Sequence, residues 1–361
     1  MGSKIFLRIR TKKISGITKL KAAVLREFNK NLEIETLDIP DLTEGQVLVD
    51  VKFSGICGAQ INQKKGIKMK NEFLPCLMGH EGSGVIIDIG RNVSTVKKGD
   101  HVVMHWRKSD GIESEFPTYY SRTSNQEIGS GLITTFSDKS IVSENRVTKI
   151  DKKHSLDVAA LLGCGVTTGF GVINNELKPD DGGTFLISGI GGVGLSSIIG
   201  AKLNKAKEII ALDINEKKLD FSRKIGSTQQ IVYKKNNKIA IDKINKVEYA
   251  IDTTGDPYLI NEIIDTLSPG GKLVLVGQPE KDKDLIIKNF LKLFNNIQIF
   301  DSQGGLTNPS KDIPLILDMH TNEKVNLKQL ISKKIKLEDI NAGFEILENQ
   351  ALVGSRILIE N

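Results

Sequence analysis

The amino-acid sequence predicts an α/β fold that combines a β-rich part with a doubly wound parallel sheet. Residues 20–150 contain short β-branched runs separated by Gly, Pro, Asp and Asn, a pattern typical of strands joined by turns. From about residue 166, apolar strands alternate with helical segments, and this alternation predicts a parallel sheet flanked by helices. The length of 361 residues favours two domains.

The expected elements follow the chain in that order. In the first part, strands are expected at residues 46–53, 84–89 and 101–104. In the second part, strands are expected at 184–188, 208–212, 249–252 and 272–276, and helices at 195–203, 216–225 and 259–267. After about residue 303, the segment GGLTNPSKDIP leads into a helix, a polar stretch and a final strand at 355–359.

Composition and charge argue against a disordered chain and against a nucleic-acid-binding protein. Hydrophobic residues make up 39% of the chain and charged residues 26%, which is typical of a folded globular protein. Residues 1–18 form a basic extension with five Lys or Arg and no acid, and removing these five from the 50 basic residues leaves 45 against 44 acidic ones. Because the body is nearly neutral, no nucleic-acid partner is expected.

Targeting and membrane signals are not found. Residues 1–18 lack the apolar run and the small-residue cleavage site of a signal peptide. The uncharged stretch 182–201 contains seven glycines, so no membrane span is expected there. Three cysteines provide no disulfide framework, which fits a reducing compartment and predicts a cytoplasmic protein.

A glycine-rich turn predicts a dinucleotide site. The segment FLISGIGGVGLSS places Gly189, Gly191, Gly192 and Gly194 between an expected strand and an expected helix. These glycines allow a tight turn and a close approach of the backbone to a pyrophosphate at the start of the helix. Asp213 follows Gly194 by 19 residues at the end of the next strand, where a carboxylate binds the ribose hydroxyls and favours NAD over NADP.

Three further residues suggest a metal site. Cys57 lies in SGICGAQINQ, His80 in PCLMGHEGSG and Cys164 in LLGCGVTTGFG. Two cysteines and a histidine leave a fourth position free on a tetrahedral ion, as a catalytic zinc requires. Taken singly, each residue has a simpler interpretation as a buried free cysteine or a core histidine.

Together these segments resemble the zinc-dependent medium-chain alcohol dehydrogenase family. The resemblance runs from about Lys19 to the C-terminus through GICG, GHEGSG, VKKGDHV, GCGVTTGFG, GIGGVG, ALDINEKKLDFSRKIGST and VGSRILI. It implies a GroES-like, partly open β-barrel catalytic domain from residues 19–165 and 303–361. A Rossmann domain that binds NAD is implied at residues 166–302, with a homodimer formed through the edge strand at 297–302 and a tetramer also compatible.

The resemblance also assigns roles to single residues. Cys57, His80 and Cys164 would bind zinc, with Glu81 behind the metal, and Trp106 would form a wall of the substrate pocket. Contacts with the cofactor are implied for the glycine turn with Val193, and for Thr254 and Val276. Thr168 would lie by the nicotinamide, Lys218 by the adenosine ribose and Arg356 by the pyrophosphate.

The chain departs from the family pattern near the metal. Residues 106–133 contain no cysteine, so a single catalytic zinc and no structural zinc are expected, with Cys76 as an inert thiol. Ala59 stands where the family has a Ser or Thr that relays a proton, and Gln60 where it has an Asp that orients the zinc-bound histidine. Asn62 occupies the position of an occasional relay histidine.

The relay must therefore involve other groups, and the candidates are Asn62, His105, Glu81 or a hydroxyl of the substrate. The polar segment at 105–126, with His105, Arg107, Lys108 and Arg122, either faces a hydroxylated or anionic substrate or forms a solvated loop. These features predict a sugar or polyol substrate rather than a simple aliphatic alcohol.

The resulting hypothesis is a zinc-dependent oxidoreductase that transfers a hydride between NAD(H) and a small alcohol or carbonyl substrate. Two alternatives remain open. One is a zinc-free quinone or enoyl reductase of the same superfamily, which would have no use for the three metal ligands. The other is a catalytically idle nucleotide-binding protein, for which Ala59 is the main argument.

Overall fold

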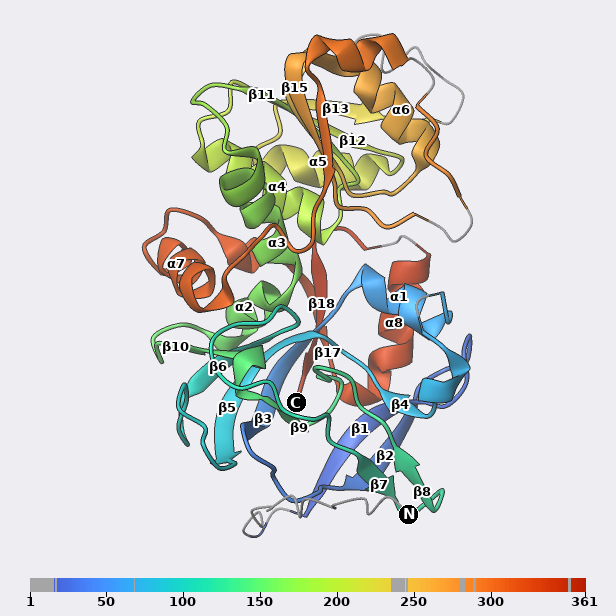
Figure 1. The fold of residues 1–361 in the computed structure, drawn as a ribbon, viewed down its shortest axis with the longest axis vertical. Helices are drawn as coiled ribbons and strands as arrows, with labels where there is room; N and C mark the ends of the chain where they lie inside the picture. The colour runs from blue at the N-terminus through green and yellow to red at the C-terminus, as the bar shows by residue number, and fades with distance from the viewer. Residues whose placement is uncertain are drawn as a thin grey trace, which may run out of the picture.

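A computed structural model of the chain describes residues 16, 18–67, 69–234, 244, 246–279, 283–287, 290–349 and 352–361. It confirms the predicted fold class. Two largely antiparallel sheets and a parallel sheet with helices occupy opposite ends of the molecule, as Figure 1 shows. Apart from residues 16 and 18, the basic extension at 1–18 lies outside the described residues.

The β-rich end contains two sheets. The first has the order β4 (Cys76–Leu77), β1 (Lys19–Leu25), β2 (Glu33–Asp38), β7 (Tyr119–Ser121) and β8 (Gln126–Ile128). The second has the order β10 (Val147–Ile150), β6 (His101–His105), β5 (Glu81–Ile89), β3 (Gln46–Ile56), β18 (Arg356–Glu360) and β17 (Ile331–Ile335), and β9 (Lys139–Ser143) also pairs with β3. The last strand of the chain, β18, pairs antiparallel with β3, so the C-terminal segment completes this sheet.

Within the described residues, the parallel sheet has six strands. Their order is β13 (Gln229–Val232), β12 (Glu208–Asp213), β11 (Thr184–Ser188), β14 (Val247–Asp252), β15 (Leu267–Leu275) and β16 (Gln298–Asp301). All neighbouring pairs are parallel. In chain order this is the doubly wound arrangement 3-2-1-4-5-6, in which the direction of winding reverses between β11 and β14. The crevice at that reversal is where such folds bind dinucleotides.

Helices connect and cover the sheets. The α-helices are α1 (Gly58–Lys64), α2 (Leu156–Ala160), α3 (Gly165–Gly171), α4 (Gly192–Leu203), α5 (Glu216–Ile225), α6 (Pro257–Thr266), α7 (Pro309–Thr321) and α8 (Ile340–Glu348). Shorter helical turns are η1 (Asn71–Phe73), η2 (Glu144–Arg146), η3 (Leu161–Gly163), η4 (Val172–Leu177), η6 (Phe290–Asn295), η7 (Leu327–Leu330) and η8 (Leu337–Asp339). Local sequence explains several starts: the Asn215 side chain caps α5, and Asp256 followed by Pro257 begins α6.

The observed elements extend the expected ones at their ends. Helix α4 begins at Gly192 rather than at residue 195, because the glycine turn itself forms the first helical turn. Strands β3 and β5 run up to the proposed metal ligands, which lie at their ends, and β15 begins five residues before the expected strand. The domain limits at 165–166 and 302–303 stay a prediction.

Long apolar helices are scarce in the described ranges. No single helix there is both long and apolar enough to cross a membrane. The stretches Leu156–Gly163 and Gly165–Leu177 reach that composition only as a pair, and a bend of 61° separates them.

Candidate active site

The three predicted metal ligands come from three separate segments. Cys57 directly follows β3 and precedes α1, and His80 directly precedes β5. Cys164 lies between η3 and α3 with φ −151° and ψ −80°, which is outside the helical region and interrupts the helical path. Each ligand therefore lies at the end of a regular element, where the backbone can turn its side chain inward.

Neighbouring glycines allow these segments to approach closely. A Cβ atom on Gly163 would lie only 2.6 Å from the Cα atom of Glu81, and a Cβ on Gly55 would collide with the Glu81 carboxylate. Any larger residue at these two positions would therefore push apart the segments that carry Cys57, His80 and Cys164. This explains in physical terms why the cysteines are found in glycine-rich surroundings.

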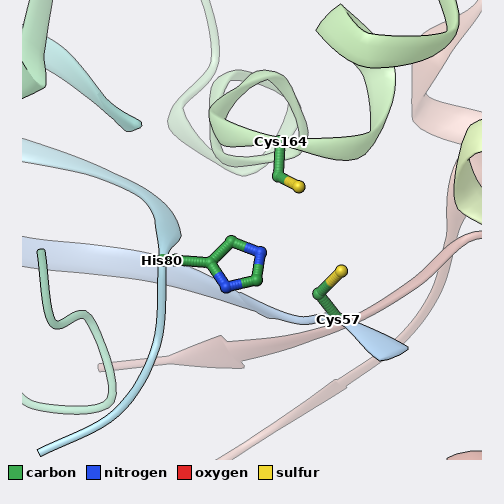
Figure 2. Close-up of side chains that lie close together, drawn as sticks. All are labelled: Cys57, His80 and Cys164. Atoms are coloured by element: carbon green, nitrogen blue, oxygen red, sulfur yellow. The ribbon is translucent and has the colours of Figure 1, made fainter. Parts of the chain in front are cut away.

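The geometry of the group suits a metal ion. One ligand atom from each of Cys57, His80 and Cys164 lies within 4.8 Å of the other two, and Figure 2 shows the side chains turned toward one another. Bond lengths of about 2.3 Å to sulfur and about 2.0 Å to nitrogen place tetrahedral zinc ligands roughly 3.5 Å apart. The donor set therefore fits zinc after a small inward movement. No second group of this kind occurs among the described residues.

Charges within the group are strongly coupled. The pKa of the Cys57 thiol is lowered because Cys164 donates a hydrogen bond to it, with the Arg356 guanidinium adding to the effect. The same hydrogen bond, together with burial, raises the pKa of Cys164. Burial opposes a charged His80, but contact with Cys57 outweighs it and raises the pKa of the imidazole. Metal binding requires both cysteines as thiolates, so a bound ion would displace the thiol protons.

Glu81 and Arg356 form a buried ion pair behind these ligands. The guanidinium contacts Glu81 through Nε, and its Nη2 lies 3.3 Å from Oε2 of Glu81 and 3.5 Å from Sγ of Cys57. Glu81 is 0% exposed and Arg356 4%. Burial raises the pKa of Glu81, while Arg356 acts in the opposite direction. The contact of Arg356 with the metal ligands is not indicated by the sequence.

Gln60 links two of the ligands. Its Oε1 accepts a hydrogen bond from the backbone N–H of Cys57 at 2.8 Å, and its Nε2 lies 3.1 Å from Nδ1 of His80. The side chain is fully buried. Because Nδ1 is engaged by Gln60, Nε2 of His80 is the nitrogen left for a metal.

The structure shows where two of the relay candidates, Asn62 and Glu81, lie relative to their neighbours. Ala59 is exposed on α1, and Asn62 lies half-buried one turn further along the same helix. Glu81 already pairs with Arg356. Thr168 is buried in α3, and its hydroxyl donates to the Cys164 carbonyl at 2.8 Å.

His105 does not suit the relay proposed for it. The ring is 2% exposed. Its Nδ1 lies 2.7 Å from the Arg107 carbonyl and its Nε2 lies 2.9 Å from the Thr148 hydroxyl. Burial lowers the pKa of His105 to about 4. Both ring nitrogens are therefore engaged within the protein, and the structure corrects the expectation that His105 moves protons for a substrate.

The charges of the polar segment also have partners within the chain. Arg107 donates to the Thr307 carbonyl at 3.0 Å and contacts the Gln303 carbonyl. Lys108 lies 3.7 Å from Glu113, and Arg122 lies 2.6 Å from Asp38. These contacts favour the alternative of a solvated loop for these side chains, and a substrate-facing role of the segment stays a prediction.

Trp106 lies where the two ends of the molecule meet. It is half-buried and packs against the buried cluster that includes Met104 and Val147. A Cβ on Gly304 would lie 2.8 Å from Cζ2 of Trp106, so the indole ring rests on the backbone that follows β16. This position is compatible with a pocket wall, which stays a prediction.

The predicted cofactor residues gather at one edge of the parallel sheet. Gly189 follows β11, Asp213 ends β12, Thr254 follows β14 and Val276 follows β15. Because all these strands are parallel, their carboxyl ends meet at the same edge, where the winding reverses. Val193 lies in the first turn of α4.

Asp213 is held in place before any cofactor binds. Its carboxylate accepts from the backbone N–H groups of Ile190 at 2.6 Å and Asn215 at 2.9 Å. These bonds tie the acid to the glycine turn, and each carboxylate oxygen keeps a free lone pair. Lys218 lies half-buried in the first turn of α5, which begins just after Asp213.

A further acid at this edge was missed from the sequence. Asp252, 0% exposed at the end of β14, accepts from the hydroxyls of Ser188 and Thr254, both at 2.7 Å, and from the backbone N–H of Gly255 at 2.8 Å. It orders the loop that carries Thr254. An acid that ends a buried strand in IDTTG is the signal that was available.

Arg356 connects the two sites. A Cβ on Gly192 would collide with its guanidinium, so the same side chain that contacts Cys57 and Glu81 also lies against the glycine turn. This location is compatible with the expected contact to a pyrophosphate, which stays a prediction. Cys76 lies elsewhere: it is buried beside Met69, and burial raises the pKa of its thiol to about 11.

Comparisons with known proteins agree with this architecture. The family model described as "Alcohol dehydrogenase GroES-like domain" matches residues 43–152, and the one described as "Zinc-binding dehydrogenase" matches residues 192–322. Curated relatives named S-(hydroxymethyl)glutathione dehydrogenase, from Escherichia coli O157:H7 and Shigella sonnei, are 28% identical over 359 residues, with 91% of this chain and 96% of theirs covered.

Solved structures agree as well. An alcohol dehydrogenase zinc-binding domain protein from Burkholderia ambifaria superposes with a TM-score of 0.85 at 25% identity, covering 95% of this chain and 98% of its own. Benzyl alcohol dehydrogenase from Acinetobacter calcoaceticus gives 0.84 at 25% identity, covering 95% and 99%. The chain therefore belongs to the zinc-dependent medium-chain dehydrogenase family and is an oxidoreductase of the alcohol dehydrogenase type.

Proposed function

We propose that this protein interconverts an alcohol and a carbonyl compound with NAD(H), using one zinc ion held by Cys57, His80 and Cys164. The observation that carries the proposal is the convergence of these three ligands within 4.8 Å. Arg356 connects them to the glycine turn. A metal site and a dinucleotide site that share a side chain are suited to hydride transfer between their ligands.

The donor set fits zinc in charge as well as in geometry. Two thiolates balance the two positive charges of the ion, and Glu81 balances Arg356, so the buried group is neutral when loaded. When bound, zinc supplies Lewis-acid polarisation of the substrate oxygen. The chain itself orients His80 through Gln60 and keeps Cys57 in place at the start of α1.

Asp213 supports a preference for NAD over NADP. Its carboxylate lies at the end of β12 and is fixed by the glycine turn, so its charge would oppose a 2′-phosphate. We expect Asp213→Ser to narrow the preference for NAD over NADP about tenfold or more, since one charge contact is worth at least about 1.4 kcal/mol in such a site. The measurement is kcat/KM for both cofactors. A wild-type preference for NADP would contradict this assignment.

The nature of the substrate is a separate part of the proposal. With His105 hydrogen-bonded within the chain and Glu81 paired with Arg356, the relay candidates that we retain are Asn62 and a hydroxyl of the substrate itself. A sugar or polyol supplies such a hydroxyl, so we propose this class. The support is now Ala59 alone, because the charged side chains of residues 105–126 have partners within the chain.

Two measurements test the proposal. Elemental analysis of the purified protein should give about one zinc per chain, as expected for a single catalytic site. Absorbance of NADH should then rise with one member of a panel containing polyols, sugars, ethanol, benzyl alcohol and S-(hydroxymethyl)glutathione. Absence of zinc after metal-replete purification would favour the zinc-free reductase. Zinc without any turnover would favour the idle nucleotide-binding protein.

We also propose a homodimer. Strand β16 (Gln298–Asp301) is the last strand of the parallel sheet on one side, and it coincides with the edge segment expected at 297–302. An unpaired edge offers N–H and C=O groups to a second copy across a two-fold axis. Light scattering that finds only a 39.7 kDa species would remove the proposal, while a tetramer would retain the same contact.

A further inference from the structure

We propose that Gln60 limits the zinc affinity of this site, because two N–H donors require its single amide oxygen once the metal is bound. The inference rests on the proposed function, since it takes Cys57, His80 and Cys164 as the metal ligands. Gln60 is a positioning residue in this scheme, and it touches two of the three ligands without binding the ion.

The contacts of Gln60 define the conflict. The side chain is fully buried, so its own amide has little access to water. Its Oε1 accepts from the Cys57 N–H at 2.8 Å, and its Nε2 is 3.1 Å from Nδ1 of His80. An amide NH2 can only donate. This arrangement is therefore satisfied when Nδ1 of His80 bears no proton.

Metal binding changes what His80 presents to Gln60. Nε2 is the ring nitrogen on the side of the two sulfurs (Figure 2). It would give its lone pair to the ion, and a neutral imidazole would then carry its proton on Nδ1. The Nδ1–H group now faces the NH2 group of Gln60, so that a donor meets a donor.

Turning the amide over does not remove the conflict. A half-turn gives the His80 N–H an acceptor, but it sets the NH2 group against the N–H of Cys57. In either orientation one buried N–H loses its acceptor, and the site holds the metal less tightly as a result. The N–H of a metal-bound imidazole is the stronger donor, so the amide is expected to turn toward His80 and leave Cys57.

A carboxylate at this position resolves the conflict. Both oxygens of Glu or Asp accept hydrogen bonds, and a negative charge beside the ligand histidine also favours the loaded state. We therefore expect Gln60→Glu, which keeps the length of the side chain, to lower the zinc dissociation constant about tenfold or more, the scale at which such supporting residues act.

Chelator competition on the full-length protein measures this effect. The variants are Gln60→Glu and Gln60→Asp, and the matched control is Gln63→Glu, which adds the same charge on the same helix, where the side chain is half-buried and contacts Met69. We expect the control to stay within about threefold of wild type, because a partly solvated charge is screened. A gain in affinity does not arise from a damaged fold.

Hydrogen exchange of the wild-type protein gives a second measurement that needs no variant. We expect the Cys57 amide proton to exchange about tenfold faster in the zinc-loaded protein than in the zinc-free protein, because it loses its acceptor. In Gln60→Glu, zinc should not cause this acceleration.

Several outcomes would overturn the inference. One is a wild-type protein that binds one zinc while neither carboxylate variant binds it more tightly; the proposed function would then survive. Equal tightening in Gln63→Glu would assign the effect to charge alone, and equal or better protection of the Cys57 amide in the zinc-loaded protein would contradict the turning of the amide. If neither the wild type nor any variant binds zinc, the proposed function fails, and this inference fails with it.

Discussion

Two clusters of polar side chains lie at the β-rich end of the molecule, and only one of them has the donor set of a metal site. The first, which we term the anchored loop, consists of residues 106–115 and the η2 side chains Glu144 and Arg146 that hold them. The second, the metal cluster, consists of Cys57, His80, Glu81, Cys164 and Arg356.

The anchored loop satisfies its charges with the chain's own groups. Glu144 accepts from the backbone N–H groups of Ser94 at 2.9 Å, Thr95 at 3.0 Å and Ile112 at 2.9 Å, and from the Thr95 hydroxyl. Arg146 forms a two-pronged pair with Glu113. This loop follows the strand after which the family often carries four zinc-binding cysteines, and hydrogen bonds hold it here.

The metal cluster, by contrast, brings two thiols and an imidazole within 4.8 Å of one another, and there Cys164 and Arg356 lower the pKa of the Cys57 thiol. Glycines at 55 and 163 preserve the close approach. The difference teaches that converging thiol and imidazole groups mark a ligand site, whereas carboxylate and guanidinium groups bonded to the chain's own loops mark structure.

The largest effect should come from breaking the metal cluster. Cys57→Ala removes one ligand, and we expect loss of bound zinc and at least a roughly 100-fold fall in kcat/KM, because the ion supplies several kcal/mol of charge stabilisation. Cys76→Ala is the matched control, since Cys76 is buried but lies beside Met69. It should retain zinc and activity. Retention of zinc by Cys57→Ala would remove Cys57 from the ligand set.

The next largest effect is expected from the removal of the Glu144 carboxylate, which lies at the centre of the anchored loop. Glu144→Ala leaves three backbone N–H groups without their acceptor, and we expect a loss of roughly 4 kcal/mol in the free energy of unfolding, without loss of zinc. Urea unfolding and elemental analysis measure the two quantities. Glu115→Gln, an exposed residue of the same loop, should change stability by less than about 0.5 kcal/mol. Zinc loss in Glu144→Ala would show that the two clusters are not independent.

His105 lies between the two clusters. Its backbone pairs with Glu81 of the metal cluster, while its ring hydrogen-bonds to the Arg107 carbonyl of the anchored loop and to the Thr148 hydroxyl. Burial lowers its pKa from 6.5 to about 4. The unfolded chain therefore binds the proton first, and the neutral ring's contribution is present above pH 6.5 and lost as the pH falls toward 4.

The size of this effect follows from the shift. The loss between pH 6.5 and 4 should be roughly 3 kcal/mol of unfolding free energy. Urea unfolding across this range should show a weaker pH dependence in His105→Gln than in wild type. Parallel profiles for the two proteins would mean that the buried ring is not the source.

Most of the fold could be predicted from the sequence, because hydrophobic period and turn residues are local signals. The strand at 184–188 and the helix at 216–225 have the expected bounds. Helix α4 begins three residues early because its first turn is made of glycines, which local propensity disfavours.

The site was less predictable where it depends on long-range contacts. Motif and spacing indicated Cys57, His80 and Cys164, but the pairing of Arg356 with Glu81 joins residues 275 positions apart. From the sequence, the charges of Arg107 and Arg122 are interpreted as free to bind a substrate, because their partners are remote in sequence. Arg107 contacts the carbonyls of residues 303 and 307, and Arg122 pairs with residue 38. Side-chain partners of this kind are set by tertiary packing, which composition does not encode.

The smallest expected effect concerns Ala59, which adjoins the metal cluster without contributing a polar atom to it. Its methyl group has no donor or acceptor, and it is exposed on the first turn of α1. If a substrate hydroxyl or Asn62 already moves the proton, a new hydroxyl is redundant. We therefore expect Ala59→Ser to change kcat by less than about threefold, well below the roughly 100-fold range of general acid–base catalysis. The measurement is steady-state turnover of the best substrate in the panel. A gain approaching the full range would show that the native site lacks an efficient relay, and ethanol turning over faster than every polyol and sugar would remove the substrate proposal.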